Sequence, residues 1–129
     1  MNLMDCHNFS DFRKLAQKKL PGPIFHYIDG AADDEITYKR NTAAFDDVDL
    51  VPNVLRGVEN VDMSVSVMGQ KLNMPLYCAP TALQRLFHHE GERAVARAAT
   101  KFGTMFGVSS LATVTVEDIA ELAPGPKLF

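Results

Sequence analysis

The sequence contains no tryptophan, only two cysteines and no long uninterrupted apolar run. Cys6 lies near the start of the chain and Cys78 inside an apolar stretch, which fits reduced thiols better than a disulfide framework. The longest apolar-leaning run, residues 74–83, is far shorter than the roughly 20 residues of a membrane-spanning helix, and residues 1–10 lack the apolar core of a signal peptide. We therefore expect a cytoplasmic protein, with association at the cytoplasmic side of a membrane as the alternative.

A basic stripe is absent as well. The 13 lysines and arginines are scattered among 16 acidic residues, and the formal net charge is −3. Proteins that bind nucleic acids cluster positive charge on one face, so we expect no nucleic-acid partner and favour a small-molecule partner. The 129 residues, of which 47% are hydrophobic, show no repeats and suffice for one domain or a piece of one.

The first part of the chain is patterned as three short helices and a hairpin. Ser10 precedes an amphipathic segment that Pro21 ends. Pro23 suits the first position of a second helix, for which Gly30 would be a left-handed stop. Alternating apolar residues around Gly69 predict a small β-hairpin. The expected helices span residues 11–20, 23–29 and 33–45, and the hairpin spans residues 63–72.

The remainder of the chain alternates between strand and helix patterns. Pro80 has no amide hydrogen for a sheet ladder and therefore ends the first strand. Gly103 is placed as a left-handed helix stop, and Thr115 with Asp118 three residues later is typical of a helix start. The expected strands span residues 76–79, 104–108 and 127–129. The expected helices span residues 92–102, buried through Val95, Ala98, Ala99 and Phe102, and 115–123, buried through Val116, Ile119, Ala120 and Ala123.

This β-α-β-α-β order is typical of an α/β domain, either a barrel or an open doubly wound sheet. The first strand–helix turn has no G-x-G-x-x-G sequence, and no P-loop sequence occurs in the chain. We therefore predict the N-terminal portion of a (β/α)8 TIM barrel, with a helical preface and a small hairpin before the β-α-β-α-β part. Residues 127–129 open a third barrel strand, so we expect residues 1–129 to be the N-terminal part of a single barrel domain, truncated in that strand.

Two turns follow the predicted strands and are the candidate sites. One contains Pro80, Thr81 and Ala82, and the other contains Ser109 and Ser110. The strands of a right-handed crossover are parallel, so both turns should emerge on the same side of the sheet. Ligands of α/β sheets and barrels bind on that side.

Four stretches of sequence carry a resemblance to a known family. Together, and in this order, they resemble the FMN-dependent α-hydroxy-acid oxidases and dehydrogenases over nearly the whole chain. The resemblance implies FMN as cofactor, a barrel roughly two to three times this length, and oxidation of an L-2-hydroxy acid, L-lactate or a similar acid, to the 2-oxo acid. The stretches are KLPGPIFHYIDGAADDE (19–35), VLRGVENVDMSVSVMG (54–69), MPLYCAPTALQRLFHHEGERAVARAA (74–99) and GVSSLATVTVEDIAE (107–121).

The resemblance also assigns roles to five residues. The backbone of Pro80, Thr81 and Ala82 would face the N5 and O4 edge of the flavin. The Ser109 hydroxyl would reach the flavin ring, and Tyr27 would contact the substrate carboxylate. The histidine base, the substrate-binding arginine and the lysine near flavin N1 come later in relatives. We therefore expect no catalytic residue in this stretch, and residues 1–129 alone should be inactive and should not retain FMN.

Each of these roles has a structural alternative. Pro80 could merely end a strand, a serine such as Ser110 could cap the following helix, and Tyr27 could be a half-buried anchor of the helical preface. His88 and His89 do not predict a metal site, because adjacent histidines diverge and no third ligand lies at the usual spacing.

Leu111 bears on the choice of substrate. It stands where glycolate oxidases have a tryptophan near the substrate, and a smaller wall would admit an acid longer than glycolate. One rival function is that of a related FMN barrel, the flavin-dependent isopentenyl diphosphate isomerase, against which Tyr27 in its HYIDGAADDE setting argues. The other rival is a non-catalytic α/β binding module. The electron acceptor is not indicated, and we expect the longer protein to form a homo-oligomer.

Overall fold

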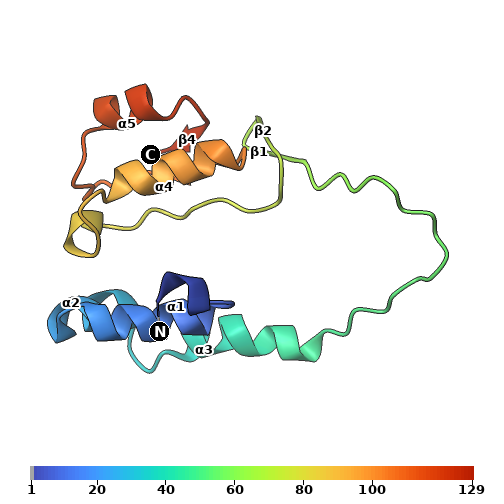
Figure 1. Ribbon diagram of the computed structural model, residues 1–129, viewed down its shortest axis with the longest axis horizontal. Coiled ribbons are helices and arrows are strands. Elements are labelled where there is room, and N and C mark those ends of the chain that lie inside the picture. The colour runs from blue at the N-terminus through green and yellow to red at the C-terminus, as the bar shows by residue number, and fades with distance from the viewer. Residues whose placement is uncertain (1) are drawn as a thin grey trace. The chain divides into compact units, whose positions relative to one another are not determined.

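The computed structural model describes residues 2–129, and the chain forms two compact units, Met1–Gly57 and Val58–Phe129. The first unit is built from helices, whereas the second combines helices with short strands (Figure 1). No helix within residues 2–129 is both long enough and apolar enough to span a membrane. Cys6 and Cys78 are both free thiols.

Helix α1 (Phe9–Lys19) begins two residues earlier than predicted. The Asn8 side chain accepts a hydrogen bond of 3.0 Å from the Asp11 amide, so Asn8 is the N-cap. Ser10, the predicted cap, lies inside the first turn of the helix. The other elements of this unit are α2 (Gly22–Asp29), α3 (Ile36–Ala43) and the 3-10 turns at Leu3–Asp5 and Ala44–Asp47.

The prediction of a left-handed Gly30 is wrong. Gly30 has φ −77° and ψ 161°, so the chain leaves α2 in an extended conformation. The reversal comes later, where Asp33 (φ 48°) and Glu35 (φ 59°) are left-handed and the Glu35 amide donates to the Ala32 carbonyl at 3.0 Å. The acidic residues therefore form the turn before α3 and not its first helical turn.

Helices α1 and α2 are joined by a small core and one ion pair. Leu15 and Phe25 are buried. Arg13 and Asp29 pair in a bidentate manner, with Nε–Oδ1 and Nη2–Oδ2 distances of 2.5 and 2.7 Å. The hydrogen bond from Arg13 holds the pKa of Asp29 below its usual value.

The predicted hairpin is confirmed. Strands β1 (Val65–Val67) and β2 (Gln70–Leu72) pair in antiparallel fashion, with Val67 opposite Gln70. Met68 (φ 50°) and Gly69 (φ 75°) both have positive φ, as a two-residue turn that matches the twist of the strands requires. Leu72 is fully buried and anchors the hairpin in the second unit.

The second unit also contains the predicted alternation of helices and parallel strands. Strand β3 (Phe106–Gly107) pairs in parallel with β4 (Lys127–Leu128). The first predicted strand, residues 76–79, is reduced to one residue: Cys78 forms an isolated parallel bridge with Phe106. Its amide donates to Met105 at 3.0 Å and its carbonyl accepts from Gly107 at 2.7 Å. Pro80 then ends the pairing because it has no amide hydrogen.

Helix α4 (Glu92–Lys101) ends one residue before the predicted end, and Gly103 is left-handed as predicted, at φ 64°. Its buried face is not the predicted one. Ala99 is buried, but Ala98 and Phe102 are exposed, and Ala96 takes their place. Small side chains at this face allow close packing against β3 and the following helix. The core of this unit consists of Ala96, Ala99, Phe106, Val108, Val114, Ile119 and Ala123.

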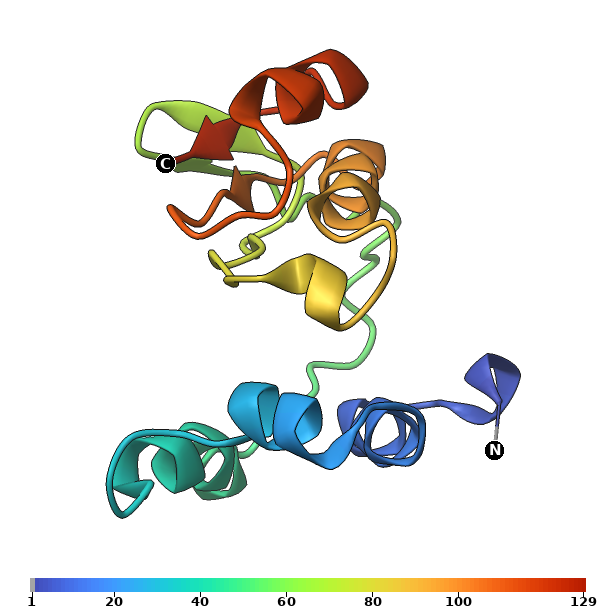
Figure 2. The same cartoon turned by 90° about the vertical axis from the view of Figure 1, so that its left-hand side faces the viewer.

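Helix α5 (Val116–Leu122) begins at the predicted cap, where Thr115 Oγ1 accepts from the Asp118 amide at 3.2 Å. Ile119 is buried as expected, whereas Val116 is exposed. Helices α4 and α5 lie side by side next to the parallel strands (Figure 2), and Arg93 of α4 pairs with Asp118 of α5 at 2.9 Å. The second unit is therefore an open beginning of an α/β sheet, not a closed barrel, in the order Cys78, β3, β4.

Candidate functional site

The two candidate turns leave the sheet on the same side. Cys78 and β3 run parallel, so the turn at Pro80–Ala82 and the turn at Ser109–Ser110 follow their carboxyl ends together. A hydrogen bond of 3.0 Å from the Leu83 amide to the Leu111 carbonyl joins the segments that follow them. The prediction that these turns lie together is confirmed by this geometry.

Gly107 sets how closely β3 approaches the first turn. A Cβ atom at Gly107 would lie 2.6 Å from Cδ, 2.8 Å from Cγ and 2.8 Å from the nitrogen of Pro80. Carbon atoms prefer separations of roughly 3.5–4.0 Å, so only glycine permits this approach without movement. Pro80 therefore does more than end a strand, because its ring packs directly on the neighbouring backbone.

The turns present backbone amides without internal partners. Within residues 2–129, the amides of Thr81, Ala82, Ser109 and Ser110 donate no hydrogen bond. The short side chains of these residues leave the main chain accessible to a flat ligand. Donors of this kind suit the carbonyl oxygen and ring nitrogens of an isoalloxazine, so the residues present fit the flavin that the resemblance implies.

The Ser109 hydroxyl organises the second turn. It accepts a hydrogen bond of 3.1 Å from the Leu111 amide, and the Ser109 carbonyl accepts one of 3.0 Å from the Ala112 amide. A hydroxyl that accepts still has its own hydrogen to donate to a ligand. The alternative in which Ser110 caps the next helix is wrong, because Thr115 caps α5.

A buried carboxylate lies beneath the turns. Glu92 is fully buried, and its two carboxylate oxygens accept hydrogen bonds from the amide (2.9 Å) and the hydroxyl (2.6 Å) of Thr113. Burial alone would raise the pKa of Glu92, but the hydrogen bonds from Thr113, from its own backbone and from the backbone of Gln84 outweigh burial. The pKa of Glu92 is therefore lowered, and the side chain is ionised at neutral pH.

Tyr27 belongs to the first unit, on α2, and its side chain is 54% exposed. This value fits a side chain that is about half buried, and it does not decide between the two roles. Both the anchoring role and the contact with the substrate carboxylate stay predictions.

The histidine pair makes local contacts. The rings of His88 and His89 lie 4.4 Å apart, and His88 Nδ1 accepts from the Glu90 amide at 3.3 Å. Glu90 in turn forms an ion pair with Arg97. No group of three or more metal-ligating side chains occurs within residues 2–129. These residues order the start of α4 and are not part of the candidate site.

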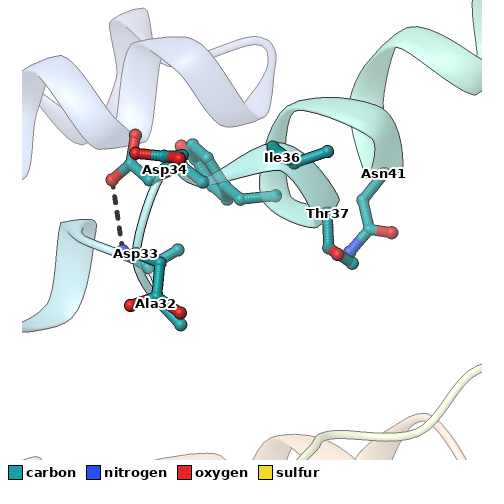
Figure 3. Close-up of a pocket in the computed structure, with 9 residues that line it drawn as sticks. Ala32, Asp33, Asp34, Ile36, Thr37 and Asn41 are labelled. Carbon is teal, nitrogen blue, oxygen red and sulfur yellow. Dashed lines mark hydrogen bonds between the residues drawn. The ribbon is translucent and has the colours of Figure 1, made fainter.

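A surface pocket of about 490 Å³ lies in the first unit, around the turn between α2 and α3 (Figure 3). Its wall includes Asp33, Asp34 and Glu35, and Glu35 accepts a hydrogen bond of 3.3 Å from the Ala31 amide. Three carboxyl groups would repel a carboxylate substrate, so the pocket does not fit a hydroxy acid. The pocket is a consequence of the left-handed turn at Asp33 and Glu35.

Sequence reasoning missed the residues that support the two turns. The sequence pattern indicates only that a helix starts at Glu92, and it indicates no role for Gly91, Gly107 or Thr113. Gly91 has φ 52°, and a Cβ atom there would lie 2.6 Å from Arg85 Cγ. The one available signal is Gly91 itself, a glycine directly before the small-residue helix that begins at Glu92.

Comparisons of the sequence with known proteins identify one family and several similar proteins. The family model of FMN-dependent dehydrogenases matches residues 16–129. Glycolate oxidase of Spinacia oleracea is 39% identical over 126 residues, which cover 98% of this chain and 34% of that protein. Glycolate oxidase 1 of Oryza sativa subsp. indica is 41% identical over 122 residues, which cover 95% of this chain and 33% of that protein.

Two solved structures extend the comparison. Mandelate oxidase with 3,3-difluoro-2-hydroxy-3-phenylpropionic acid matches with a TM-score of 0.84 and 36% identity, over 93% of this chain and 36% of that one. A mutant of an active chimera of (S)-mandelate dehydrogenase matches with a TM-score of 0.84 and 38% identity, over 93% of this chain and 34% of that one. The chain thus spans about a third of the length of these relatives.

Proposed function

This chain belongs to the family of FMN-dependent dehydrogenases, and we propose that residues 1–129 form the N-terminal portion of an enzyme that oxidises an L-2-hydroxy acid to the 2-oxo acid. FMN is the cofactor of the family, and the elements described above are part of the barrel fold of its solved relatives. Relatives are glycolate oxidases and mandelate oxidase, whose names specify small 2-hydroxy acids.

One observation carries the proposal. The turns at Pro80–Ala82 and Ser109–Ser110 lie at the same edge of the sheet, are joined by the Leu83–Leu111 hydrogen bond, and present amides that have no partner within residues 2–129. Preorganised backbone donors around small side chains are what a flat, polar-edged ring requires. Neither a metal site nor a basic phosphate-binding cluster competes for these turns in the described chain.

The residues of this chain would bind the flavin and orient the substrate. When bound, FMN supplies the acceptor for the two electrons that leave the hydroxy acid. The amides of Thr81 and Ala82 would hold the polar edge of its ring, and Ser109 would donate its hydroxyl hydrogen from the neighbouring turn. Tyr27 would fix the substrate carboxylate by a hydrogen bond. The group that takes the substrate proton would come from a later part of the barrel.

L-lactate or a somewhat larger acid is the substrate that we propose. Leu111 lies in the second turn, its side chain is 60% exposed, and its carbonyl accepts from the Leu83 amide. A leucine wall leaves more room than an aromatic ring would, which favours a substrate with a longer side chain than glycolate.

The rival functions require different features. An isopentenyl diphosphate isomerase would need a diphosphate site, and Tyr27 in its HYIDGAADDE setting argues against that function. A non-catalytic binding module could use the same amides, and turnover of a hydroxy acid by the completed barrel distinguishes the two functions. We further propose a cytoplasmic enzyme that is a homo-oligomer when complete. The electron acceptor and peripheral membrane association would be set by the later part of the chain.

The proposal is tested by completing the barrel. Residues 1–129 are fused to the part of spinach glycolate oxidase that follows the matched region, and the product is called the fusion below. The match covers 98% of this chain at 39% identity. We expect a yellow, monodisperse fusion whose visible absorbance is bleached by an L-2-hydroxy acid under anaerobic conditions. Residues 1–129 alone are expected to stay colourless.

Two results would contradict the proposal. A folded fusion, shown to be helical and monodisperse, that binds no FMN would remove the flavin role from the two turns. A yellow fusion that responds to no hydroxy acid in a series from glycolate to mandelate would retain the flavin role and exclude the proposed substrate class.

A further inference from the structure

A buried carboxylate is the strongest unassigned feature of the second unit. Glu92 is the first residue of α4 and is completely buried, although charged side chains are almost never fully buried without partners. Its position at a helix N-terminus favours a negative charge, but the helix alone does not require burial. Thr113, which donates to both carboxylate oxygens of Glu92, lies in the loop after β3, and this contact explains why the side chain points inward.

Thr113 links this carboxylate to both turns. Its amide and hydroxyl donate to Glu92, and its hydroxyl oxygen accepts a hydrogen bond of 3.3 Å from the Arg85 amide. Thr113 follows the Ser109 turn closely, and Arg85 follows the Pro80 turn closely. One hydroxyl group therefore bridges the two segments that carry the candidate flavin-binding amides.

The charge of Glu92 sets the direction of these hydrogen bonds. An ionised carboxylate can only accept, so the Thr113 hydroxyl must donate to it and keeps a lone pair for the Arg85 amide. A carboxamide at the same position would place an NH₂ group against this hydroxyl, which would then face two donors. The lowered pKa of Glu92 is consistent with a carboxylate that stays ionised.

The backbone at Gly91 lies so close to Arg85 and Thr113 that it leaves no room for a side chain. A Cβ atom at Gly91 would lie 2.6 Å from Arg85 Cγ, 3.2 Å from the Arg85 nitrogen and 3.4 Å from Thr113 Oγ1. On the other side, the buried Gln84 side chain donates to the Thr81 carbonyl at 3.3 Å. A continuous series of contacts thus connects Glu92 with the second turn through Thr113, and with the first turn through Arg85 and Gln84.

From this geometry we propose that Glu92 is a positioning residue, which holds the Pro80 and Ser109 turns at the separation needed to bind one flavin ring. The proposal rests on the proposed function, because it names how the same site is held. Glu92 does not touch the ring and takes no part in proton transfer. It acts through Thr113, whose hydroxyl is hydrogen-bonded both to Glu92 and to the Arg85 amide and so restrains the segments that follow both turns.

The test uses the fusion and matched pairs of variants. Glu92→Gln removes the charge with little change of shape, and Thr113→Val removes the hydroxyl with little change of volume. Glu117→Gln is the control for charge, because Glu117 is exposed on α5, and Thr113→Ser is the control that retains the hydroxyl. We expect FMN to bind about tenfold or more weakly in the first two variants, and near the parental affinity in both controls.

A second readout separates positioning from stability. The visible circular dichroism of bound FMN reports the surroundings of the ring, and it is measured well below the melting temperature at saturating FMN. We expect it to change in Glu92→Gln and in Thr113→Val, with no further change in the double variant because both act through one contact. Lower melting temperatures with unchanged FMN affinity and unchanged dichroism would overturn the proposal and leave Glu92 a structural residue only.

A third measurement distinguishes failure of this proposal from failure of the proposed function. Exchange of the Leu83 amide hydrogen, which bonds to the Leu111 carbonyl, is followed in the 129-residue chain itself. Faster exchange in Glu92→Gln than in Glu117→Gln supports the connection between the turns even if the parental fusion fails to bind FMN. Equal exchange in the two variants would overturn the connection, whatever the fusion binds.

Discussion

Replacing Gly107 by alanine tests how closely β3 must approach the first turn. The added methyl group would lie 2.6 Å from Cδ and 2.8 Å from Cγ of Pro80. These separations are about 1 Å shorter than the optimum for two carbon atoms. The proline ring is closed and cannot rotate out of the way, so the backbone of the turn must move.

Two opposing effects determine how much Gly107→Ala lowers the free energy of unfolding. Overpacking of a fitted contact costs about 1–3 kcal/mol, and alanine returns about 0.4–1 kcal/mol by restricting the unfolded chain. With mid-range values of about 2 and about 0.7 kcal/mol, the net destabilisation is about 1.3 kcal/mol. With a mid-range urea dependence of about 2 kcal/mol/M, the unfolding midpoint should fall by roughly 0.7 M.

The assay is urea unfolding of the 129-residue chain, followed by circular dichroism, with Gly22→Ala as the control. A Cβ atom at Gly22 meets nothing within 4 Å, so that variant should keep or slightly raise the midpoint. In the fusion, Gly107→Ala should also weaken FMN binding because the Pro80 turn is displaced. If both variants behaved alike in unfolding and in FMN affinity, the close approach would not constrain the site.

The remaining predictions concern single groups, and the first three are measured in the fusion. Ser109→Ala should lower FMN affinity or shift its potential through loss of a hydrogen bond worth about 0.5–1.5 kcal/mol; a change in melting temperature alone would confine the serine to its turn. Tyr27→Phe should raise KM for the hydroxy acid about ten- to hundredfold while FMN stays bound, and an unchanged KM and kcat would remove Tyr27 from the site. Leu111→Trp should reduce kcat/KM for longer acids more than for glycolate, whereas equal losses would place Leu111 outside the pocket wall. In the 129-residue chain, the stability that Glu92 contributes should be complete above its ordinary pKa of 4.5 and be lost as the pH falls through its lower folded value. Glu92→Gln should therefore flatten the acid limb of the stability curve, and an identical limb would show that the carboxylate has the same pKa in both states.

Local signals in the sequence predicted local structure well. The Thr115 cap, the left-handed Gly103 and the two-residue hairpin turn at Gly69 each depend on residues within a few positions of one another. The prediction of a left-handed Gly30 was wrong although it also relied on a local signal. A glycine after a helix permits a left-handed stop, but the neighbouring Asp33 and Glu35 provide the reversal instead, and Gly30 stays extended.

Features that depend on distant partners were not predictable from spacing. The first barrel strand contains one bridged residue, because Cys78 pairs with β3 only briefly before Pro80 ends the ladder. The buried residues of α4, Glu92, Ala96 and Ala99, keep helical spacing, but they lie on a different face from the one predicted, because contacts with β3 and α5 decide which face is buried. Glu92 was the largest omission, since a charged residue in an amphipathic helix is normally assigned to the solvent side.

The candidate site itself is visible in the sequence only as small residues. Side chains with conspicuous chemistry, the His88–His89 pair and the acidic turn at Asp33–Glu35, are explained by local contacts. The groups that suit a flavin are backbone amides, which every residue other than proline possesses and which no composition reveals. What selects the turns is the structure around them: Gly107 allows the close approach, and the partners of Glu92 fix the separation. If the two turns bind the flavin as we propose, function depends on the absence of side-chain volume at the turns and on the one buried charge of Glu92. Substitutions that enlarge the turns should then be more damaging than substitutions of exposed charged residues.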